Sequence, residues 1–242
     1  MALHLKKFDC LNLILLFSTA LLMLIFIPVA GSVDQMLSLP WVDHSGYYLR
    51  ESWFLVKVGH EFLKNLVILI AIIHAVVWLK LSIEKSSSPW RSISGVVVLG
   101  MMISVAVIGL LKSQSIHACP WALLQVNQEH VDWLRPLSSR GKCFPGGHAS
   151  AGFSLLILYF AYRPFYPKLA RYGLAFALVM GIVMSAVQMV RGAHFLSHNL
   201  WALWWSWLID FMLYKVWQMR WSYHLKACLL YTSPSPRDQR GS

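Results

Sequence analysis

The chain has 242 residues, of which 57% are hydrophobic and 13% are charged, and its formal net charge is +11. Apolar runs of about 20 residues recur along it, and a helix of that length crosses about 30 Å of hydrocarbon, which argues against a soluble globular protein. The cations lie in the segments that flank these runs. There they set topology and contact anionic lipid headgroups, so the positive charge does not indicate binding to nucleic acid.

We predict an all-α fold, an integral membrane bundle of six transmembrane helices. Only helices and closed barrels satisfy backbone polar groups in lipid, and continuous apolarity without alternation selects helices. The sequence shows neither an internal repeat nor a soluble domain. The predicted spans are about Leu11 to Ala30, Asn65 to Leu81, Ile93 to Leu111, Ala149 to Tyr162, Tyr172 to Val190, and Phe195 to Trp217.

The first apolar run has two interpretations. It follows Lys6 and Lys7 and ends at Pro28-Val-Ala-Gly31, which is also the pattern of a cleaved signal peptide. The run is longer than the usual signal core of about 7–15 residues, so we favour a retained first span.

The distribution of lysine and arginine predicts the orientation. Basic residues gather in short segments that would share one face of the membrane, and the positive-inside rule makes this face cytoplasmic. Both termini then lie inside, and two longer loops, roughly Gly31 to Lys64 and Lys112 to Gly147, lie outside. We therefore expect a multi-pass protein of the bacterial inner membrane whose outer loops face the periplasm.

The last residues differ from the rest of the chain. From Cys228 onward they break from the helical pattern and resemble the translation of a sequencing adapter. We therefore assign residues 1–227 to one membrane domain and treat 228–242 as a non-native tail. A genuine disordered tail rich in proline and serine is the alternative.

Two further cysteines, Cys119 and Cys143, share the second outer loop. An oxidising periplasm would permit a disulfide between them. Two unpaired small apolar residues near the interface are the alternative.

Three segments with chemically distinctive residues emerge on the outer face under this topology. Lys112 ends the third span, His148 begins the fourth after Pro145-Gly-Gly, and Arg191 to His194 lie between the fifth and sixth. Each alone has an ordinary interpretation, such as a snorkelling lysine or the first turn of a helix. Together they supply a nucleophile, an acid for the leaving group and cations for phosphate oxygens, as phosphoryl transfer requires.

The order and spacing of these residues resemble the type 2 phosphatidic acid phosphatase family, which shares its fold with vanadium haloperoxidases. In that family a lysine is followed after six residues by Arg-Pro, then by Pro-Ser-Gly-His, then by Ser-Arg, five residues, His, three residues and Asp. The resemblance in motif covers about residues 112 to 200. The corresponding residues here are Lys112, Cys119-Pro120, Pro145-Gly-Gly-His148, and Arg191-Gly-Ala-His194-Phe-Leu-Ser-His198.

Three positions depart from the family pattern. Cys119 stands where the first arginine belongs, and a thiol cannot replace the bidentate contact of a guanidinium with phosphate. The second arginine would fall at Gln188, whereas Arg191 lies about one helical turn further on and can reach a phosphate from there. His198 replaces the aspartate. Its neutral imidazole can accept the proton that orients His194, but stabilises an imidazolium less than a carboxylate would.

The resemblance implies a stepwise reaction that uses no cofactor and no metal. His194 attacks phosphorus in line and forms a phosphohistidine, while His148 protonates the departing oxygen and later takes a proton from water. His198 orients the nucleophile. Glycines let the backbone approach an anion closely, and a helix N-terminus carries about half a positive charge. The implied phosphate-binding groups are Lys112, Arg191 and the amides of Gly146, Gly147 and His148.

Simpler or competing interpretations apply to some of the polar residues. His194 and His198 lie at a helical i, i+4 spacing that could bind zinc, but no third ligand is evident in the sequence. His60, at the outer mouth of the second span, is more simply an interfacial residue. Asp210 is an intramembrane acid near the inner end of the sixth span, where we expect it to take part in helix packing.

We therefore expect a membrane lipid phosphatase that hydrolyses phosphate or pyrophosphate monoesters of lipids at the outer leaflet. Its expected partners are the bilayer and the lipid phosphate substrate. A site at the bilayer surface can receive a headgroup laterally while the hydrocarbon chain stays in lipid. The alternatives are a lipid headgroup phosphotransferase that uses the same phosphohistidine, and a catalytically silent structural relative.

Overall fold

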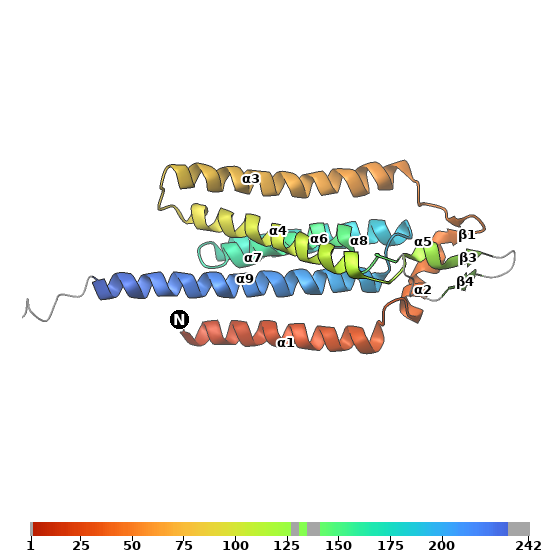
Figure 1. Cartoon of the computed structure of the whole chain (residues 1–242), viewed down its shortest axis with the longest axis horizontal. Helices are drawn as coiled ribbons and strands as arrows, with labels where there is room; N and C mark the ends of the chain where they lie inside the picture. The colour runs from red at the N-terminus through yellow and green to blue at the C-terminus, as the bar shows by residue number, and fades with distance from the viewer. Residues whose placement is uncertain (1, 127–130, 135–140, 232–242) are drawn as a thin grey trace, which may run out of the picture.

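A computed structural model describes residues 2–126, 131–134 and 141–231. Its long helices lie side by side along the longest axis of the molecule (Figure 1). The apolar runs form helices because lipid offers no partner for backbone polar groups. The long helices are α1 (Ala2–Phe26), α3 (Leu63–Ile83), α4 (Pro89–Gln114), α8 (Pro167–Val190) and α9 (Leu196–Tyr231).

Shorter elements connect the long helices, and those labelled α2 and α5 lie at one end of the bundle (Figure 1). Two two-stranded antiparallel hairpins, β1–β2 and β3–β4, lie at this end (Figure 1). The hairpin strands are β1 (Val42–Asp43), β2 (Gly46–Tyr47), β3 (Leu124–Val126) and β4 (Val131–Trp133). The short helices are α2 (Ser32–Ser38), 3-10 helix η1 (Leu39–Trp41), π-helix η2 (Leu55–Phe62), α5 (Pro120–Leu123), α6 (Gly147–Phe153), 3-10 helix η3 (Ser154–Leu156) and α7 (Ile157–Tyr162).

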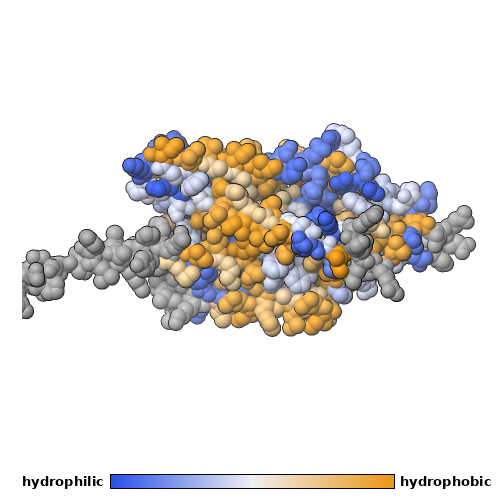
Figure 2. All heavy atoms as spheres, viewed as in Figure 1, coloured by the Kyte–Doolittle hydropathy of each residue, from blue (hydrophilic) through white to orange (hydrophobic). Residues whose placement is uncertain are grey.

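Four helical segments within the described residues are long and apolar enough to cross a membrane, and they confirm the first, second, third and fifth predicted spans. Apolar residues cover much of α1 and the central part of α3, with hydrophilic residues gathered at either end of α3 (Figure 2). The other two predicted spans correspond to α6–η3–α7 and to α9, and the count of six stays a prediction. The four segments are Lys7–Phe26, Leu55–Ile83, Pro89–Gln114 and Pro167–Val190.

The segment formed by α6, η3 and α7 is the centre of the bundle. It packs against α4, α8 and α9, and Leu155, Ile157 and Phe160 are fully buried within it. Asp210 of α9 is also fully buried and accepts a hydrogen bond from Ser104 Oγ of α4 at 3.1 Å. This bond joins α9 to α4, which agrees with the predicted packing role of the acid.

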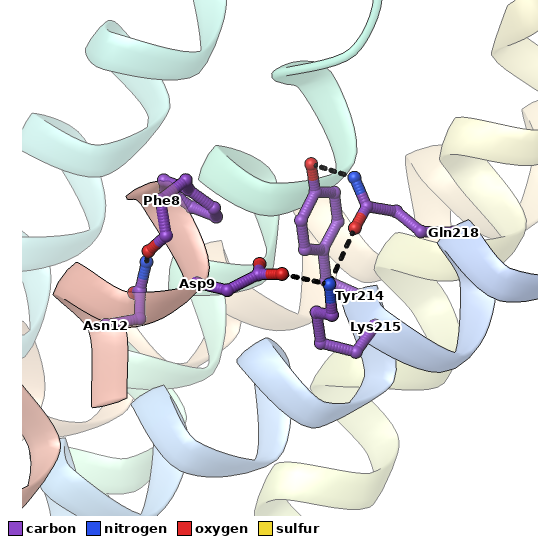
Figure 3. Close-up of polar contacts among 6 residues, drawn as sticks. All are labelled: Phe8, Asp9, Asn12, Tyr214, Lys215 and Gln218. Carbon is purple, nitrogen blue, oxygen red and sulfur yellow. Dashed lines mark hydrogen bonds and ion pairs between the residues drawn. The ribbon is translucent and has the colours of Figure 1, made fainter. Parts of the chain in front are cut away.

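Helix α1 is attached to α9 by polar contacts at the end of the bundle opposite to the hairpins (Figure 1). Lys215 of α9 forms an ion pair with Asp9 of α1, and Gln218 lies 3.4 Å from the same ammonium (Figure 3). One turn further along α1, Asn12 Oδ1 accepts a hydrogen bond from Trp207 Nε1 at 2.9 Å. These contacts hold α1 against α9 at the end of the bundle that lies away from the predicted outer loops.

The C-terminal part of the chain departs from its predicted boundary. Helix α9 continues to Tyr231, so the change of composition at Cys228 does not end the helix. Residues 232–242 lie outside the described residues. The assignment of the tail as non-native stays a prediction.

Candidate active site

Four helix ends meet at the hairpin end of the bundle: the C-termini of α4 and α8 and the N-termini of α6 and α9 (Figure 1). Lys112 lies in the last turn of α4, and His148 in the first turn of α6. His194 lies in the turn between α8 and α9. The predicted convergence of these three residues at one end of the bundle is therefore confirmed.

Lys112 lies over the first turn of α6. Its Nζ is 3.3 Å from the position that a Cβ on Gly147 would occupy, so a larger residue there would require the ammonium to shift by a few tenths of an ångström. The amides at the start of a helix have no intrahelical acceptor, and the helix dipole adds positive charge there. A lysine cation and a helix N-terminus thus face the same place, which is an arrangement that binds anions.

The amide of Gly146 takes no part in such an anion site. It donates a hydrogen bond to the carbonyl of His198 at 2.9 Å. The prediction that this amide contacts phosphate is therefore wrong, because the bond is used to tie the loop before α6 to the first turn of α9. The amides of Gly147 and His148 are the ones that open the helix.

His194 and His198 are in direct contact. Their Nδ1 atoms lie 3.4 Å apart, and the two residues are 3% and 0% exposed. When His194 donates from Nδ1 to His198, its Nε2 carries no proton and keeps a free lone pair. A nucleophilic imidazole attacks through such a nitrogen. Each of the two imidazoles also forms a hydrogen bond with the backbone of Cys143. The contact would allow His198 to orient His194, and the orienting role itself stays a prediction.

The electrostatics of the site favour a neutral imidazole at His194. His194 lies in the turn outside the membrane-spanning helices, and burial lowers its pKa well below the usual value of 6.5. Coulombic interactions with His198, Lys112 and His148 lower that pKa further, through the Lys112 cation and through either neighbouring imidazole when it is protonated. A neutral imidazole at ordinary pH retains the lone pair that attack on phosphorus requires.

His60 contributes a second imidazole beside His148, although the simpler interpretation of the sequence was an interfacial residue rather than one lining the entrance of the site. The centroids of the two rings are 3.9 Å apart, with the planes inclined by 42°. His60 lies in η2, and π-helical turns of this kind occur frequently at functional sites. Burial, which is the largest cause, and the charges of His60, Lys112, Lys64 and Arg191 together lower the pKa of His148 to about 4. The surroundings of His148 are therefore positive, as an anionic substrate requires. An anion bound among these groups would offset the positive charges and favour the protonated form of His148.

Arg191 is held by the first outer loop. Its Nε donates to the carbonyl of Arg50 at 2.9 Å, which leaves the other N–H groups of the guanidinium for an anion. The guanidinium of Arg50 lies 4.5 Å from the centroid of the Trp121 ring, two residues after Cys119. Arg50 thus places a second guanidinium near the segment in which the family arginine is missing. Its exposed side chain gave no signal in the sequence.

The turn that carries His194 depends on Gly192 and Gln188. Gly192 has a φ of +72°, in the left-handed region that commonly ends helices, and a Cβ there would lie 2.4 Å from the Tyr47 ring. The Gln188 carbonyl then accepts the amides of Ala193 at 2.8 Å and His194 at 3.3 Å. Gln188, which occupies the position of the family's second arginine, therefore shapes the turn through its backbone.

Cys119 and Cys143 form a disulfide with a Cα–Cα distance of 5.2 Å, which confirms the pairing that the sequence left open. The amide of Cys143 also donates to the His117 carbonyl at 2.9 Å. The residue that replaces the family's first arginine thus joins the segment after α4 to the segment before α6. Its structural contribution is a covalent bond in place of a cation.

The zinc alternative receives no support from the arrangement of side chains. Within residues 2–126, 131–134 and 141–231, no group of three or more histidine, cysteine, aspartate or glutamate side chains is placed to hold a metal ion. His194 and His198 instead contact each other through their Nδ1 atoms.

Comparison with known proteins agrees with this geometry. Residues 94–222, over half of the chain, match the PAP2 superfamily. The crystal structure of a transmembrane PAP2-type phosphatidylglycerolphosphate phosphatase from Bacillus subtilis is similar, with a TM-score of 0.51 and 16% identity over 88% of this chain and 96% of that one. At this identity the likeness shows the fold alone. Curated protein sequences gave no match. The chain belongs to the PAP2 superfamily and is a multi-pass membrane protein.

Proposed function

We propose that this protein is a lipid phosphatase that hydrolyses phosphate or pyrophosphate monoesters of membrane lipids through a phosphohistidine on His194. One observation carries the proposal. A buried imidazole contacts a second imidazole at 3.4 Å, on the same end of the bundle where Lys112 lies over the first turn of α6. A nucleophile and an anion site are thereby combined, which is what phosphoryl transfer needs.

The reaction proceeds in two displacements. In the first, Nε2 of His194 forms a bond to phosphorus while the bond to the lipid oxygen breaks, and His148 donates its proton to that oxygen. In the second, water attacks phosphorus, His148 takes its proton, and the bond to His194 breaks to release phosphate. Lys112, Arg191 and the amides of Gly147 and His148 hold the non-bridging oxygens throughout.

The donors around the anion are cations and amides, so we propose that the reaction needs no metal ion. Activity should persist in excess chelator. Vanadate should inhibit, because it adopts the five-coordinate geometry of the displacement and would occupy the same donors. Loss of activity on chelation, restored by zinc, would instead favour a metal centre at His194 and His198.

The proposed location is the outer leaflet of the bacterial inner membrane. The positive-inside rule, applied to the basic residues of the sequence, favours an outer position for the hairpin end of the bundle, where the four helix ends that carry the candidate site lie. A lipid headgroup can then enter from the bilayer surface while its hydrocarbon chain stays among the apolar helices. A single cysteine introduced at Ser45 should react with a membrane-impermeant reagent in intact cells, and one at Ser87 should not.

The test of the function is phosphate release from a panel of lipid phosphates and diphosphates by the purified full-length protein. We expect turnover of at least one lipid, with turnover abolished in His194→Ala. His44→Ala is the matched control, because His44 lies exposed in the first outer loop and should leave the rate unchanged. Turnover by His194→Ala at the wild-type rate would remove His194 from its role. Analysis of products with an acceptor lipid present separates hydrolysis from transfer.

A further inference from the structure

Asp34 is a buried acid in the first outer loop that the reaction as described does not use. It lies in α2, is 1% exposed, and falls outside the residues that match the superfamily. Its carboxylate accepts three hydrogen bonds, from the Ser197 amide at 2.9 Å, from Ser197 Oγ at 2.5 Å and from the Ala30 amide at 2.8 Å. A buried carboxylate with this many donors is held in a single position.

The partner of Asp34 is the start of the helix that follows the nucleophile. Ser197 is the second residue of α9, whose first amides have no intrahelical acceptor. Asp34 satisfies one of them from a segment 163 residues away. Its negative charge also lies at the positive end of the helix dipole. Asp34 therefore caps α9 as an N-cap side chain would, but from another part of the chain.

The capped segment carries both histidines of the contact described above. His194 lies three residues before Ser197, and His198 follows it directly. The contact between their Nδ1 atoms requires the turn before α9 and the first turn of α9 to keep one relative orientation. Asp34 accepts hydrogen bonds from both the backbone and the side chain of Ser197, which lies between these two histidines in the sequence.

Asp34 is itself fixed at the end of α1. The Ala30 amide binds its carboxylate, and Ser38 Oγ donates to its backbone carbonyl at 2.9 Å. All three donors at the carboxylate are N–H or O–H groups, so the site fits an acceptor without a proton. Burial raises the pKa of Asp34, and the bonds from Ser197 and Ala30 oppose that rise.

We propose that Asp34 is a positioning residue for phosphoryl transfer: by capping α9 from the first outer loop, it holds His194 and His198 in their reacting arrangement. The inference rests on the proposed function of His194. It gives the first outer loop a part in positioning the reacting groups, although none of its residues belongs to the family motifs.

The test compares kcat and KM of purified full-length variants, per folded molecule as measured by size-exclusion chromatography. Asp34→Asn keeps the shape but replaces one acceptor with an N–H group that faces other donors. We expect kcat to fall by about 10- to 100-fold, because small misplacements of reacting groups have effects of this size. KM should change by less than about threefold, since Lys112 and Arg191 are untouched.

Ser197→Ala is the second variant, which removes the hydroxyl and keeps the amide contact. We expect a smaller fall in kcat, about 3- to 10-fold, and no further loss when it is combined with Asp34→Asn, because both act through one contact. The matched control is Asp43→Asn. Asp43 lies in the same loop, but its described hydrogen bonds are to Ser45, so kcat should stay within about twofold of wild type.

Each outcome is decisive. A carboxylate that served only stability would lower the amount of folded protein and leave kcat per folded molecule unchanged, and that result would overturn the proposal. Additive losses in the double variant would also overturn it. If Asp34→Asn fails to fold, an unchanged kcat in Ser197→Ala has the same consequence. Failure of the wild-type protein to turn over any lipid phosphate would refute the proposed function and this role with it, whereas normal turnover by Asp34→Asn refutes the role alone.

Discussion

Replacement of Gly147 by alanine should lower activity while leaving stability unchanged or improved. A Cβ on Gly147 would lie 3.3 Å from Lys112 Nζ and 3.6 Å from Lys112 Cδ. The first distance is shorter than an ordinary contact, so the ammonium must move by a few tenths of an ångström. In the proposed reaction this ammonium holds a phosphate oxygen. A displacement of 1 Å can cost about 100-fold in rate, so we expect kcat/KM to fall by about 3- to 10-fold.

Stability should move in the opposite direction. Alanine is more favourable than glycine in a helix by up to about 1 kcal/mol, and Gly147 does not have the positive φ that would strain alanine. Thermal unfolding of Gly147→Ala should therefore occur at or above the wild-type temperature. The matched control is Gly109→Ala in α4, where a Cβ would meet nothing within 4 Å, so that activity should stay at the wild-type level.

The assay combines phosphate release from a lipid phosphate with a thermal unfolding scan of the same preparation. Wild-type activity in Gly147→Ala would show that Lys112 does not act from the position over α6. A loss of activity accompanied by an equal loss in Gly109→Ala would mean that the bundle, rather than the anion site, had been perturbed.

Three further predictions concern the nucleophile and its supports. Because burial lowers the pKa of His194, the imidazole stays neutral as pH falls below 6.5, and the pH profile of kcat/KM should show no loss from this group until pH reaches the lowered pKa. A limb at the ordinary histidine value that the ionisation of the substrate phosphate does not account for would contradict this burial. Replacing Cys119 and Cys143 by serine should lower the free energy of unfolding by about 2–4 kcal/mol, measured by denaturant titration, and a reductant should have the same effect on wild type alone. His198→Asp should retain substantial activity and His198→Ala should be slower but active, since a carboxylate can accept the His194 proton and alanine cannot; wild-type rates for His198→Ala would remove the orienting role.

Features of the fold that depend on local sequence pattern could be predicted from the sequence. Apolar runs predict helices because each backbone group in lipid needs an intrahelical partner, and four of the six predicted spans meet the criteria of length and composition. The convergence of Lys112, His148 and His194 follows from the same pattern, because helix ends on one side of a membrane must share one end of a bundle. The pairing of Cys119 with Cys143 was one of two open interpretations.

The contacts that hold the site could not be predicted in this way. Asp34 and Ser197 are 163 residues apart, and Arg50 and Arg191 are 141 residues apart. No periodicity encodes such pairs, because they depend on how the outer loops pack after the helices have associated. The Gly146 amide was assigned to phosphate on the general property of helix N-termini, but the carbonyl of His198 lies close enough to accept it.

Residues that the motif does not include place guanidinium groups near the two positions at which the family arginines are missing. With Cys119 in place of an arginine, one cation is lost from the segment after α4, but Arg50 lies over Trp121 in that same segment. With Gln188 in place of the second arginine, Arg191 provides a guanidinium one turn later and is held by the carbonyl of Arg50. Both arrangements involve Arg50 of the first outer loop. We therefore expect that exchanging this loop for that of another family member affects the site more than exchanging any other loop.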